Sequence, residues 1–183
     1  DFWYIPEFVE APLREEIFER LKAEIDWRQN YMTFYGRQVS LPRLNSYYGL
    51  KDYLYSGITN KARDFPPIIE LIRSKINEKI SGFSKTFNSV LLNYYRDRND
   101  SISAHSDDES SLGANPKIVS LSLGAERVFK IKHKETKVVT NLYLQKGSLL
   151  LMGNFSQQLY THAVGKTSED VGERINLTFR KVI

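Results

Sequence analysis

The chain has 183 residues, a length typical of one domain with a substantial hydrophobic core. It contains no cysteine, which excludes disulfides and thiolate zinc sites and fits an intracellular protein of the cytoplasm or nucleus. No run approaches the roughly 18 apolar residues of a membrane span, so we expect no membrane association. The net charge of +4 is compatible with a polyanionic partner such as a nucleic acid but does not identify one.

Two helices are predicted in the first 80 residues. The first begins at about Pro12, and its apolar side chains recur every four residues at Leu13, Ile17, Leu21 and Ile25. The second runs from Pro67 to about Ile80, with an apolar face formed by Ile68, Leu71, Ile72, Ile76 and Ile80. Gly82 follows as a stop signal. Between the helices, residues 28–65 are rich in aromatic side chains and arginines, and we expect loops and hairpins that cover one end of a barrel.

After Gly82 the sequence changes to short β-type runs separated by glycines and charged turns. These runs are 87–95, 117–123, 127–132, 137–144, 148–152, 159–164 and 174–182. Their regular spacing predicts an antiparallel barrel or sandwich. With the two helices, this makes the chain an α+β protein that is mainly β, organised as a single domain over residues 1–183.

Polar residues crowd together directly after the first β-type run, in NYYRDRNDSISAHSDDES at residues 93–110. His105 and Asp107 form a His-x-Asp pair, and on an extended segment both side chains point to the same side. One distant histidine would complete the two-histidine, one-carboxylate set of non-haem Fe(II) oxygenases, which leaves coordination positions open for a cosubstrate and dioxygen. The run from 96 to 100 is expected to be a solvated turn.

Two other histidines are available. His133 lies among lysines in KIKHK, where a solvated hairpin end is the better interpretation. His162 lies in the apolar run LYTHAV and is the stronger candidate. At this point a chance His-x-Asp pair and a packed strand histidine remain the alternative.

The last β-type run contributes a second polar face. In RINLTFR, strict alternation places Arg174, Asn176, Thr178 and Arg180 on one side of the strand. Two arginines on such a face suit a dicarboxylate held by charge-assisted hydrogen bonds. The same parity places Asn93 and Tyr95 together on their own strand. A solvent-facing strand would alternate in the same way, but the anion face and the metal face together indicate Fe(II) with 2-oxoglutarate.

From about residue 35 to its end, the chain resembles the AlkB-type nucleic-acid dealkylases. The resemblance rests on Asn93-x-Tyr95, His105-x-Asp107-Asp108-Glu109, His162 and Arg174-x-Asn176-x-Thr178-Phe179-Arg180. TFNSVLLNYYRD, HSDDESSLG and RINLTFR are similar to the animal homologues that repair DNA and RNA. The resemblance implies a double-stranded β-helix (jelly-roll) core at 84–183 under a nucleotide-recognition lid at 28–65.

The resemblance also implies roles for the site residues. Fe(II) would be held by His105, Asp107 and His162, and 2-oxoglutarate by Arg174 and Arg180 with help from Asn93, Tyr95, Asn176 and Thr178. Dioxygen would be the third reactant. Glu109, supported by Asp108, would accept a hydrogen bond from the exocyclic amino group of the base.

The lid would supply further contacts to a flipped base. Arg43 takes the position of an arginine near the base, and Tyr53, Tyr55 and Ser56 fall in the hairpin that provides an aromatic stacking face. Tyr35 stands where duplex-specialised relatives carry an apolar wedge, and the turn after Tyr48-Gly49 is two residues shorter. Strand preference is therefore not fixed by the sequence, and ordinary packing remains the alternative for these tyrosines.

The expected reaction is oxidative demethylation of 1-methyladenine and 3-methylcytosine in DNA, and also in RNA, with release of succinate, CO2 and formaldehyde. The expected partners are alkylated DNA and RNA, and we expect a monomer that acts in alkylation-damage repair. Three alternatives stay open: a 2-oxoglutarate-dependent hydroxylase or demethylase of proteins or small molecules, an eraser of RNA modifications, and a module that binds methylated nucleic acid without turnover.

Overall fold

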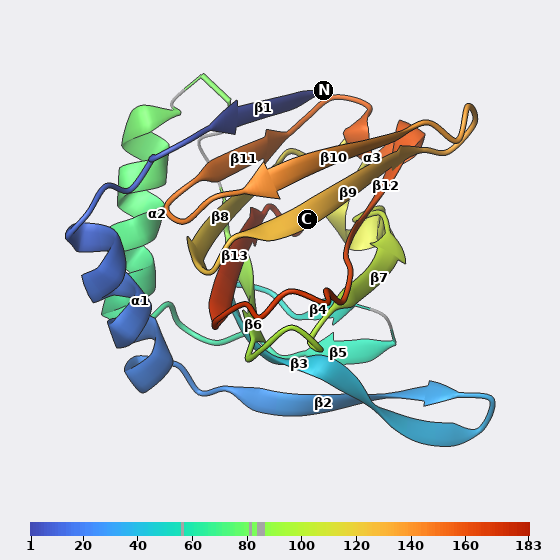
Figure 1. Cartoon of the computed structure of the whole chain (residues 1–183), viewed down its shortest axis with the longest axis horizontal. Coiled ribbons are helices and arrows are strands. Elements are labelled where there is room, and N and C mark those ends of the chain that lie inside the picture. Colours follow the sequence, from blue (N-terminus) through green and yellow to red (C-terminus); the bar gives the residue numbers. More distant parts are fainter. Residues whose placement is uncertain (56, 81, 84–86) are drawn as a thin grey trace.

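The computed structural model of the chain describes residues 1–183 except 56, 81 and 84–86 (Figure 1). Within this part, strands pair antiparallel in two main sheets. The large sheet has the order β1 (Phe2–Ile5), β11 (Leu149–Met152), β8 (Ile118–Gly124), β13 (Arg174–Arg180), β6 (Ser89–Tyr95), β3 (Arg37–Gly49) and β2 (Arg28–Phe34). The small sheet has the order β10 (Val139–Leu144), β9 (Arg127–His133), β12 (Tyr160–Val164) and β7 (Ile102–His105). A hairpin of β4 (Tyr53–Tyr55) and β5 (Ile58–Asn60) completes the set.

Each of the seven β-type runs predicted after Gly82 coincides with a strand, from β6 and β8 to β13. A cluster of apolar side chains from both sheets, among them Leu150 and Phe129, packs between them. This arrangement confirms the mainly β, jelly-roll fold. None of the described helices is long and apolar enough to span a bilayer.

Helices α1 (Leu13–Glu24) and α2 (Pro67–Lys79) pack on the outer face of the large sheet (Figure 1). Pro67 occupies the first turn of α2, where its missing N–H costs nothing, and Glu70 and Lys79 complement the helix dipole at the two ends. Both predicted helices are confirmed. The predicted face of α2 is wrong at one position: Leu71 is half exposed, because the buried stripe turns toward Ile69 instead.

The central strand β13 is buried along its whole length. Ile175, Leu177 and Phe179 face the helices and belong to the main hydrophobic core. Arg174, Asn176, Thr178 and Arg180 point the other way and line a cavity between the two sheets. The solvent-facing alternative for this strand is therefore wrong, and its polar face lies inside the protein.

Residues 28–65 include more regular structure than loops and hairpins alone. The second half of β3 pairs with β6, from Leu44 opposite Tyr94 to Gly49 opposite Ser89, so β3 and β2 widen the large sheet. The far end of the β2–β3 hairpin extends past the sheet in Figure 1. A nucleotide-recognition role for this segment stays a prediction.

Short helical turns complete the chain. Helix α3 (Ser156–Leu159) leads into β12, and a 3-10 turn, η1 (Ser110–Leu112), follows the acidic run after β7. Strands β1 and β7, which are only four residues long, were not predicted from the sequence.

Candidate metal centre and cosubstrate cavity

The three expected metal ligands meet at the end of the small sheet. His105 is the last residue of β7, Asp107 follows two residues later, and His162 lies opposite His105 on β12. One potential ligand atom from each residue lies within 4.8 Å of the other two. We refer to these residues as the trio. This geometry fits one divalent cation bound by two imidazoles and a carboxylate.

The charges of the trio suit a cation. Burial lowers the pKa of both imidazoles, to about 3 for His162, so that each ring is neutral at pH 7 and presents a lone pair. Burial alone would raise the pKa of Asp107, but the Arg180 guanidinium beside it holds this pKa below its ordinary value. Asp107 Oδ1 is buried and accepts no hydrogen bond from any described residue. A buried, charged oxygen without a donor is the atom that a metal ion would satisfy.

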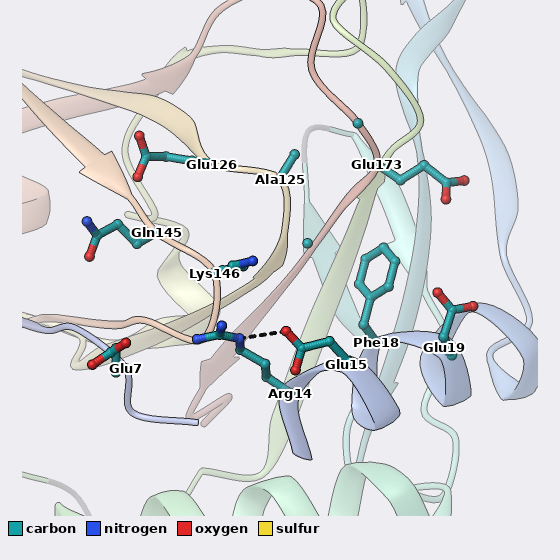
Figure 2. Close-up of a pocket in the computed structure, with 12 residues that line it drawn as sticks. Glu7, Arg14, Glu15, Phe18, Glu19, Ala125, Glu126, Gln145, Lys146 and Glu173 are labelled. Atoms are coloured by element: carbon teal, nitrogen blue, oxygen red, sulfur yellow. Dashed lines mark hydrogen bonds and ion pairs between the residues drawn. The ribbon is translucent and has the colours of Figure 1, made fainter. Parts of the chain in front are cut away.

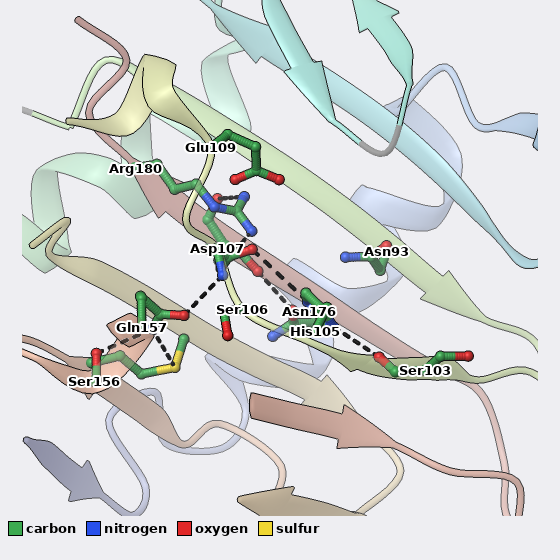
Figure 3. A network of polar contacts seen from close by, with 12 residues as sticks. Asn93, Ser103, His105, Ser106, Asp107, Glu109, Ser156, Gln157, Asn176 and Arg180 are labelled. Atoms are coloured by element: carbon green, nitrogen blue, oxygen red, sulfur yellow. Dashed lines mark hydrogen bonds and ion pairs between the residues drawn. The ribbon is translucent and has the colours of Figure 1, made fainter. Parts of the chain in front are cut away.

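Neighbouring groups orient two members of the trio, His105 and Asp107 (Figure 3). His105 Nδ1 lies 2.8 Å from the carbonyl oxygen of Ser103, a contact that places the ring proton on Nδ1 and leaves Nε2 for the metal. The backbone N–H of Asp107 donates to Gln157 Oε1 at 2.9 Å. Gln157 is buried in α3, and no motif in the sequence pointed to it.

His133 is excluded from the trio by its position at the β9–β10 hairpin. Its Nδ1 accepts hydrogen bonds from the backbone N–H groups of Glu135 and Thr136, both at 3.2 Å. The ring therefore stabilises a turn, as the sequence indicated.

A cavity lined in part by the trio also holds the side chains expected at the cosubstrate. Its lining includes all six side chains expected at the cosubstrate: Asn93, Tyr95, Arg174, Asn176, Thr178 and Arg180. All six are buried. The cavity therefore joins a cation site to a polar chamber with two arginines.

The two arginines lie at different positions in this chamber. Arg180 Nη2 donates to Asp107 Oδ2 at 2.9 Å, which places its charge beside the trio. Arg174 is fully buried against the ring of Tyr95 and donates from Nη2 to Ser122 Oγ at 2.9 Å. Its Nε and Nη1 find no hydrogen-bond partner among the described residues. Because a buried guanidinium with open donors is costly, an anion such as a 2-oxoglutarate carboxylate fits this end of the cavity.

Three asparagines form a row across the large sheet. Asn45 on β3 lies opposite Asn93 on β6, and Asn93 lies opposite Asn176 on β13. Asn93 Oδ1 accepts hydrogen bonds from Asn45 Nδ2 at 2.6 Å and from Arg43 Nε at 2.8 Å. Asn176 is engaged by protein groups, donating to Ser120 Oγ and accepting from Thr178 Oγ1. Contacts of Asn176 and Thr178 with the cosubstrate stay a prediction.

Glu109, one of the residues expected at the base, lies beside Arg180 in Figure 3. Tyr53 donates to Glu109 Oε2 at 3.0 Å, and burial raises the pKa of this carboxyl group. Tyr53 itself is fully buried, with the Arg180 guanidinium 5.7 Å from its ring centre. Asp108 is exposed, and its Oδ2 lies 3.7 Å from Lys134 Nζ.

The other predicted base contacts are spread over the 28–65 segment. Tyr35 is 92% exposed at the turn between β2 and β3, where its φ of 46° is left-handed. Arg43 is buried and bonded to Asn93, which the resemblance did not imply. Ser56 and the side chain of Tyr55 lie outside the part of the chain that is described.

Residues 96–99 are exposed, as expected of a solvated turn, but Asp100 departs from that expectation. Asp100 is buried and accepts hydrogen bonds from the backbone N–H, Nε and Nη2 of Arg96. Buried Arg127 on β9 donates to the carbonyl oxygens of Asp100, at 3.0 Å, and Gly165, at 2.6 Å. The turn after β6 of the large sheet is therefore bonded to β9 of the small sheet. Charged residues beside turns are usually exposed, and for this reason the burial of Asp100 was not predicted from the sequence.

A wide pocket of about 720 Å³ lies elsewhere, between the start of α1 and the turns at 124–126, 145–146 and 172–173 (Figure 2). Its charged lining consists of Glu7, Arg14, Glu15, Glu19, Glu126, Lys146 and Glu173. None of the predicted site residues that the structure describes lines it. Its excess of carboxylates also makes it unsuited to a polyanion.

Comparison with known proteins agrees with this geometry. A family model described as the 2OG-Fe(II) oxygenase superfamily matches residues 1–180. The mouse alpha-ketoglutarate-dependent dioxygenase alkB homolog 3 is 37% identical over 187 residues, covering 97% of this chain and 64% of the relative. The human DNA oxidative demethylase ALKBH2 is 33% identical over 183 residues, covering 92% of this chain and 69% of the relative.

The chain is an AlkB-type member of the 2OG-Fe(II) oxygenase superfamily. It spans about 64% of the length of the mouse relative. The solved structure of OsALKBH1 superposes with a TM-score of 0.65 over 98% of this chain and 97% of the other, at 19% identity, which supports the fold. Oxygenases of this superfamily use Fe(II), 2-oxoglutarate and dioxygen, and the trio is the candidate iron site.

Proposed function

We propose that the chain oxidatively demethylates 1-methyladenine and 3-methylcytosine in DNA, and also in RNA. The observation that carries this proposal is the Glu109 carboxylate, fixed by Tyr53 two residues beyond a metal ligand. Both lesions present an exocyclic amino group beside the methylated ring nitrogen, and a carboxylate at this position accepts its hydrogen bond. The names of the AlkB homologue relatives, one a DNA oxidative demethylase, support the same substrate class.

The geometry supports the following roles for the chain's own residues. The trio would hold the metal, and Arg174 and Arg180 would orient the cosubstrate in the cavity between the two sheets. Glu109 positions the base, and its negative charge with that of Asp108 favours a cationic methylated ring. Bound Fe(II), with 2-oxoglutarate and dioxygen, supplies the oxidation of the N-methyl carbon, which leaves as formaldehyde while succinate and CO2 form.

Wider features are compatible with this role. The net charge of +4 and the exposed tyrosines of the β2–β3 hairpin, Tyr31 and Tyr35, offer charge and stacking surface to an unstacked strand. We propose a monomer of the cytoplasm or nucleus that repairs alkylated DNA and RNA.

The decisive experiment measures formaldehyde and succinate released from oligonucleotides with either lesion in single-stranded DNA, duplex DNA and RNA. Matched unmethylated oligonucleotides and a peptide panel serve as controls. We expect equal amounts of both products from the methylated oligonucleotides alone. Turnover of peptides without turnover of any oligonucleotide would instead establish a protein hydroxylase.

A variant tests the role of Glu109. Glu109→Gln should raise KM for the oligonucleotide by about tenfold, the effect of one charged hydrogen bond, and leave 2-oxoglutarate affinity unchanged. Glu126→Gln, at an exposed carboxylate far from the trio, should match the wild type. Unchanged KM in Glu109→Gln would remove Glu109 from base recognition.

A further inference from the structure

We infer that Arg43 and Asn45 are positioning residues that fix the amide of Asn93 with its NH2 group toward the cosubstrate. This inference rests on the proposed function only in taking 2-oxoglutarate as the occupant of the cavity. It departs from the resemblance, which places Arg43 at the base.

The argument begins with the polarity of the hydrogen bonds. A guanidinium has five donors and no acceptor, so the group facing Arg43 Nε must be an oxygen. The 2.8 Å contact therefore identifies Oδ1 of Asn93, which a side-chain amide would otherwise leave ambiguous. Asn45, 2.6 Å from the same oxygen, must then present its own NH2 group.

Two donors occupy both lone pairs of Asn93 Oδ1. Turning the amide over would place its NH2 group against the guanidinium and a second NH2 group, which is unfavourable. The amide nitrogen is therefore held on the opposite side. Asn93 lines the cavity, and Figure 3 shows its nitrogen directed to the side where Asp107 and Asn176 lie. A fixed donor at this position suits an anionic cosubstrate.

The orientation of the Asn93 amide leaves a polar atom of its neighbour Asn45 unpaired. Asn45 Oδ1 is buried and has no hydrogen-bond partner among the described residues. Leaving this oxygen unpaired does not favour the observed orientation of Asn45. We attribute the orientation to Asn93 Oδ1, which Arg43 holds in place and which needs a donor from Asn45.

Arg43 is itself firmly held. It is 4% exposed, and its Nη1 donates to the carbonyl oxygen of Ser101 at 3.0 Å. The backbone N–H of Ser101 donates back to Pro42 at 2.8 Å, so β3 and the turn before β7 are joined twice. The β3 strand therefore takes part in cosubstrate binding through Asn93, which couples the 28–65 segment to the cavity.

The test measures 2-oxoglutarate binding directly, by anaerobic calorimetry on the Mn(II)-loaded protein. Asn45→Asp replaces the donor with an acceptor at nearly constant shape and should raise the Kd for 2-oxoglutarate by about tenfold. Arg43→Gln should do the same, and Arg43→Lys, which keeps a donor and the charge, should recover part of the affinity. Gln38→Ala, on the exposed end of β3, should bind as the wild type does.

A double-mutant cycle separates positioning from other roles. In an Asn93→Ala background, Arg43→Gln and Asn45→Asp should have no further effect on the Kd, because their target is gone. In turnover, KM for 2-oxoglutarate should rise while KM for the oligonucleotide does not. Additive effects on the Kd, or a rise confined to the oligonucleotide KM, would overturn the inference.

The outcomes also separate this inference from the proposed substrate. Loss of cosubstrate affinity in the variants supports the inference even if the wild type demethylates no oligonucleotide. Conversely, an active demethylase whose variants bind 2-oxoglutarate normally refutes the inference and leaves the proposed function standing. Circular dichroism and thermal melts of each variant show that the folded protein is being compared.

Discussion

Arg174 shows, at the scale of one residue, that a ligand-binding group can destabilise the folded protein when its ligand is absent. Its guanidinium is fully buried, and two of its nitrogens have no partner in the described structure. Burial also lowers the pKa of this side chain, a further sign that its charge is poorly solvated. Such a group is retained for binding rather than for stability.

Arg174→Met should therefore separate binding from stability. We expect the melting temperature without cosubstrate to stay the same or increase, since a buried charge is replaced by an apolar side chain. The Kd for 2-oxoglutarate should rise at least about thirtyfold, because a buried charge pair is worth more than about 2 kcal/mol when one partner is lost. Thermal melts with and without 2-oxoglutarate measure both effects.

Lys130→Met, on an exposed position of β9, is the matched control and should retain the full shift with cosubstrate. A normal shift in Arg174→Met would show that the open nitrogens do not face the cosubstrate.

Two histidines on adjacent strands, His162 in the trio and His133 outside it, provide a test of the metal ligands. His162→Ala should weaken Co(II) binding more than about 100-fold, since loss of even an outer partner of a metal ligand costs about 10 to 100-fold. Turnover should be lost as well. His133→Ala should preserve both, because that ring caps a hairpin turn. Co(II) absorption titrations read out binding without turnover, and equal behaviour of the two variants would refute the assigned ligand set.

At the scale of elements, the large sheet carries opposite chemistry on its two faces. Apolar residues of β6, β8 and β13 face helices α1 and α2, whereas polar residues of the same strands line the cavity. The helices therefore stabilise the large sheet, which carries Arg174 and Arg180. They contribute no side chain to the lining of the cavity. Stability and cosubstrate affinity should respond to separate substitutions.

Helix α2 offers a matched pair to test this separation. Ile76 is 0% exposed in the core and Leu71 is 50% exposed on the same helix. Ile76→Ala should lower the free energy of unfolding by about 2–5 kcal/mol, through lost burial and the cavity left behind. Leu71→Ala should change it by less than about 0.5 kcal/mol. Urea unfolding measures both, and a changed 2-oxoglutarate Kd in folded Ile76→Ala would argue against independent faces.

Glu173 connects α1, β6 and β13 and gives a prediction about pH. It accepts hydrogen bonds from Lys22 Nζ at 2.5 Å and from the hydroxyl of Tyr94. Lys22 and then Tyr94 hold the pKa of Glu173 below its ordinary value of 4.5. Because the folded state has the lower pKa, this contribution to stability is present at neutral pH and is lost as the pH falls through the folded pKa.

Glu173→Gln should accordingly cost at most about 1 kcal/mol at pH 7, since the pair is partly exposed and screened by solvent. The difference from the wild type should shrink as the pH is lowered below 4.5. Urea unfolding across this range is the measurement, with Glu169→Gln, at an exposed carboxylate, as the control. A difference that grew at acid pH would have the wrong sign for this linkage.

At the scale of the whole molecule, alternation and periodicity predicted the helices and the strands of the core. The identity and spacing of polar residues also predicted the trio and the lining of the cavity, because residue type and strand parity together determine which side chains share a face. The row of asparagines and the roles of Arg43 and Gln157 were beyond prediction. They depend on which strands pair and in which register, across separations of 48 to 50 residues.

The 28–65 segment was the hardest part for a related reason. Strand β3 pairs with β2 along much of its length and with β6 in its second half, so it belongs to a hairpin and to the core sheet. A local pattern cannot show that one strand serves both partners. Arg127 was missed because its charge is satisfied by carbonyl groups distant in the sequence, such as that of Asp100. Asp100 was missed because its carboxylate turns inward to pair with Arg96 four residues earlier.

The two-faced burial of β13 limits how this chain can change in length. One residue inserted or deleted within the strand would turn every later side chain to the opposite face. Arg180 would then point at the isoleucines and leucines of the core, and Phe179 would enter the cavity. The connection at 165–173, which is largely exposed, can take up added or lost residues without such a reversal. Functional descendants of this sequence should therefore differ from it in β13 by substitution and gain or lose residues only outside the strand.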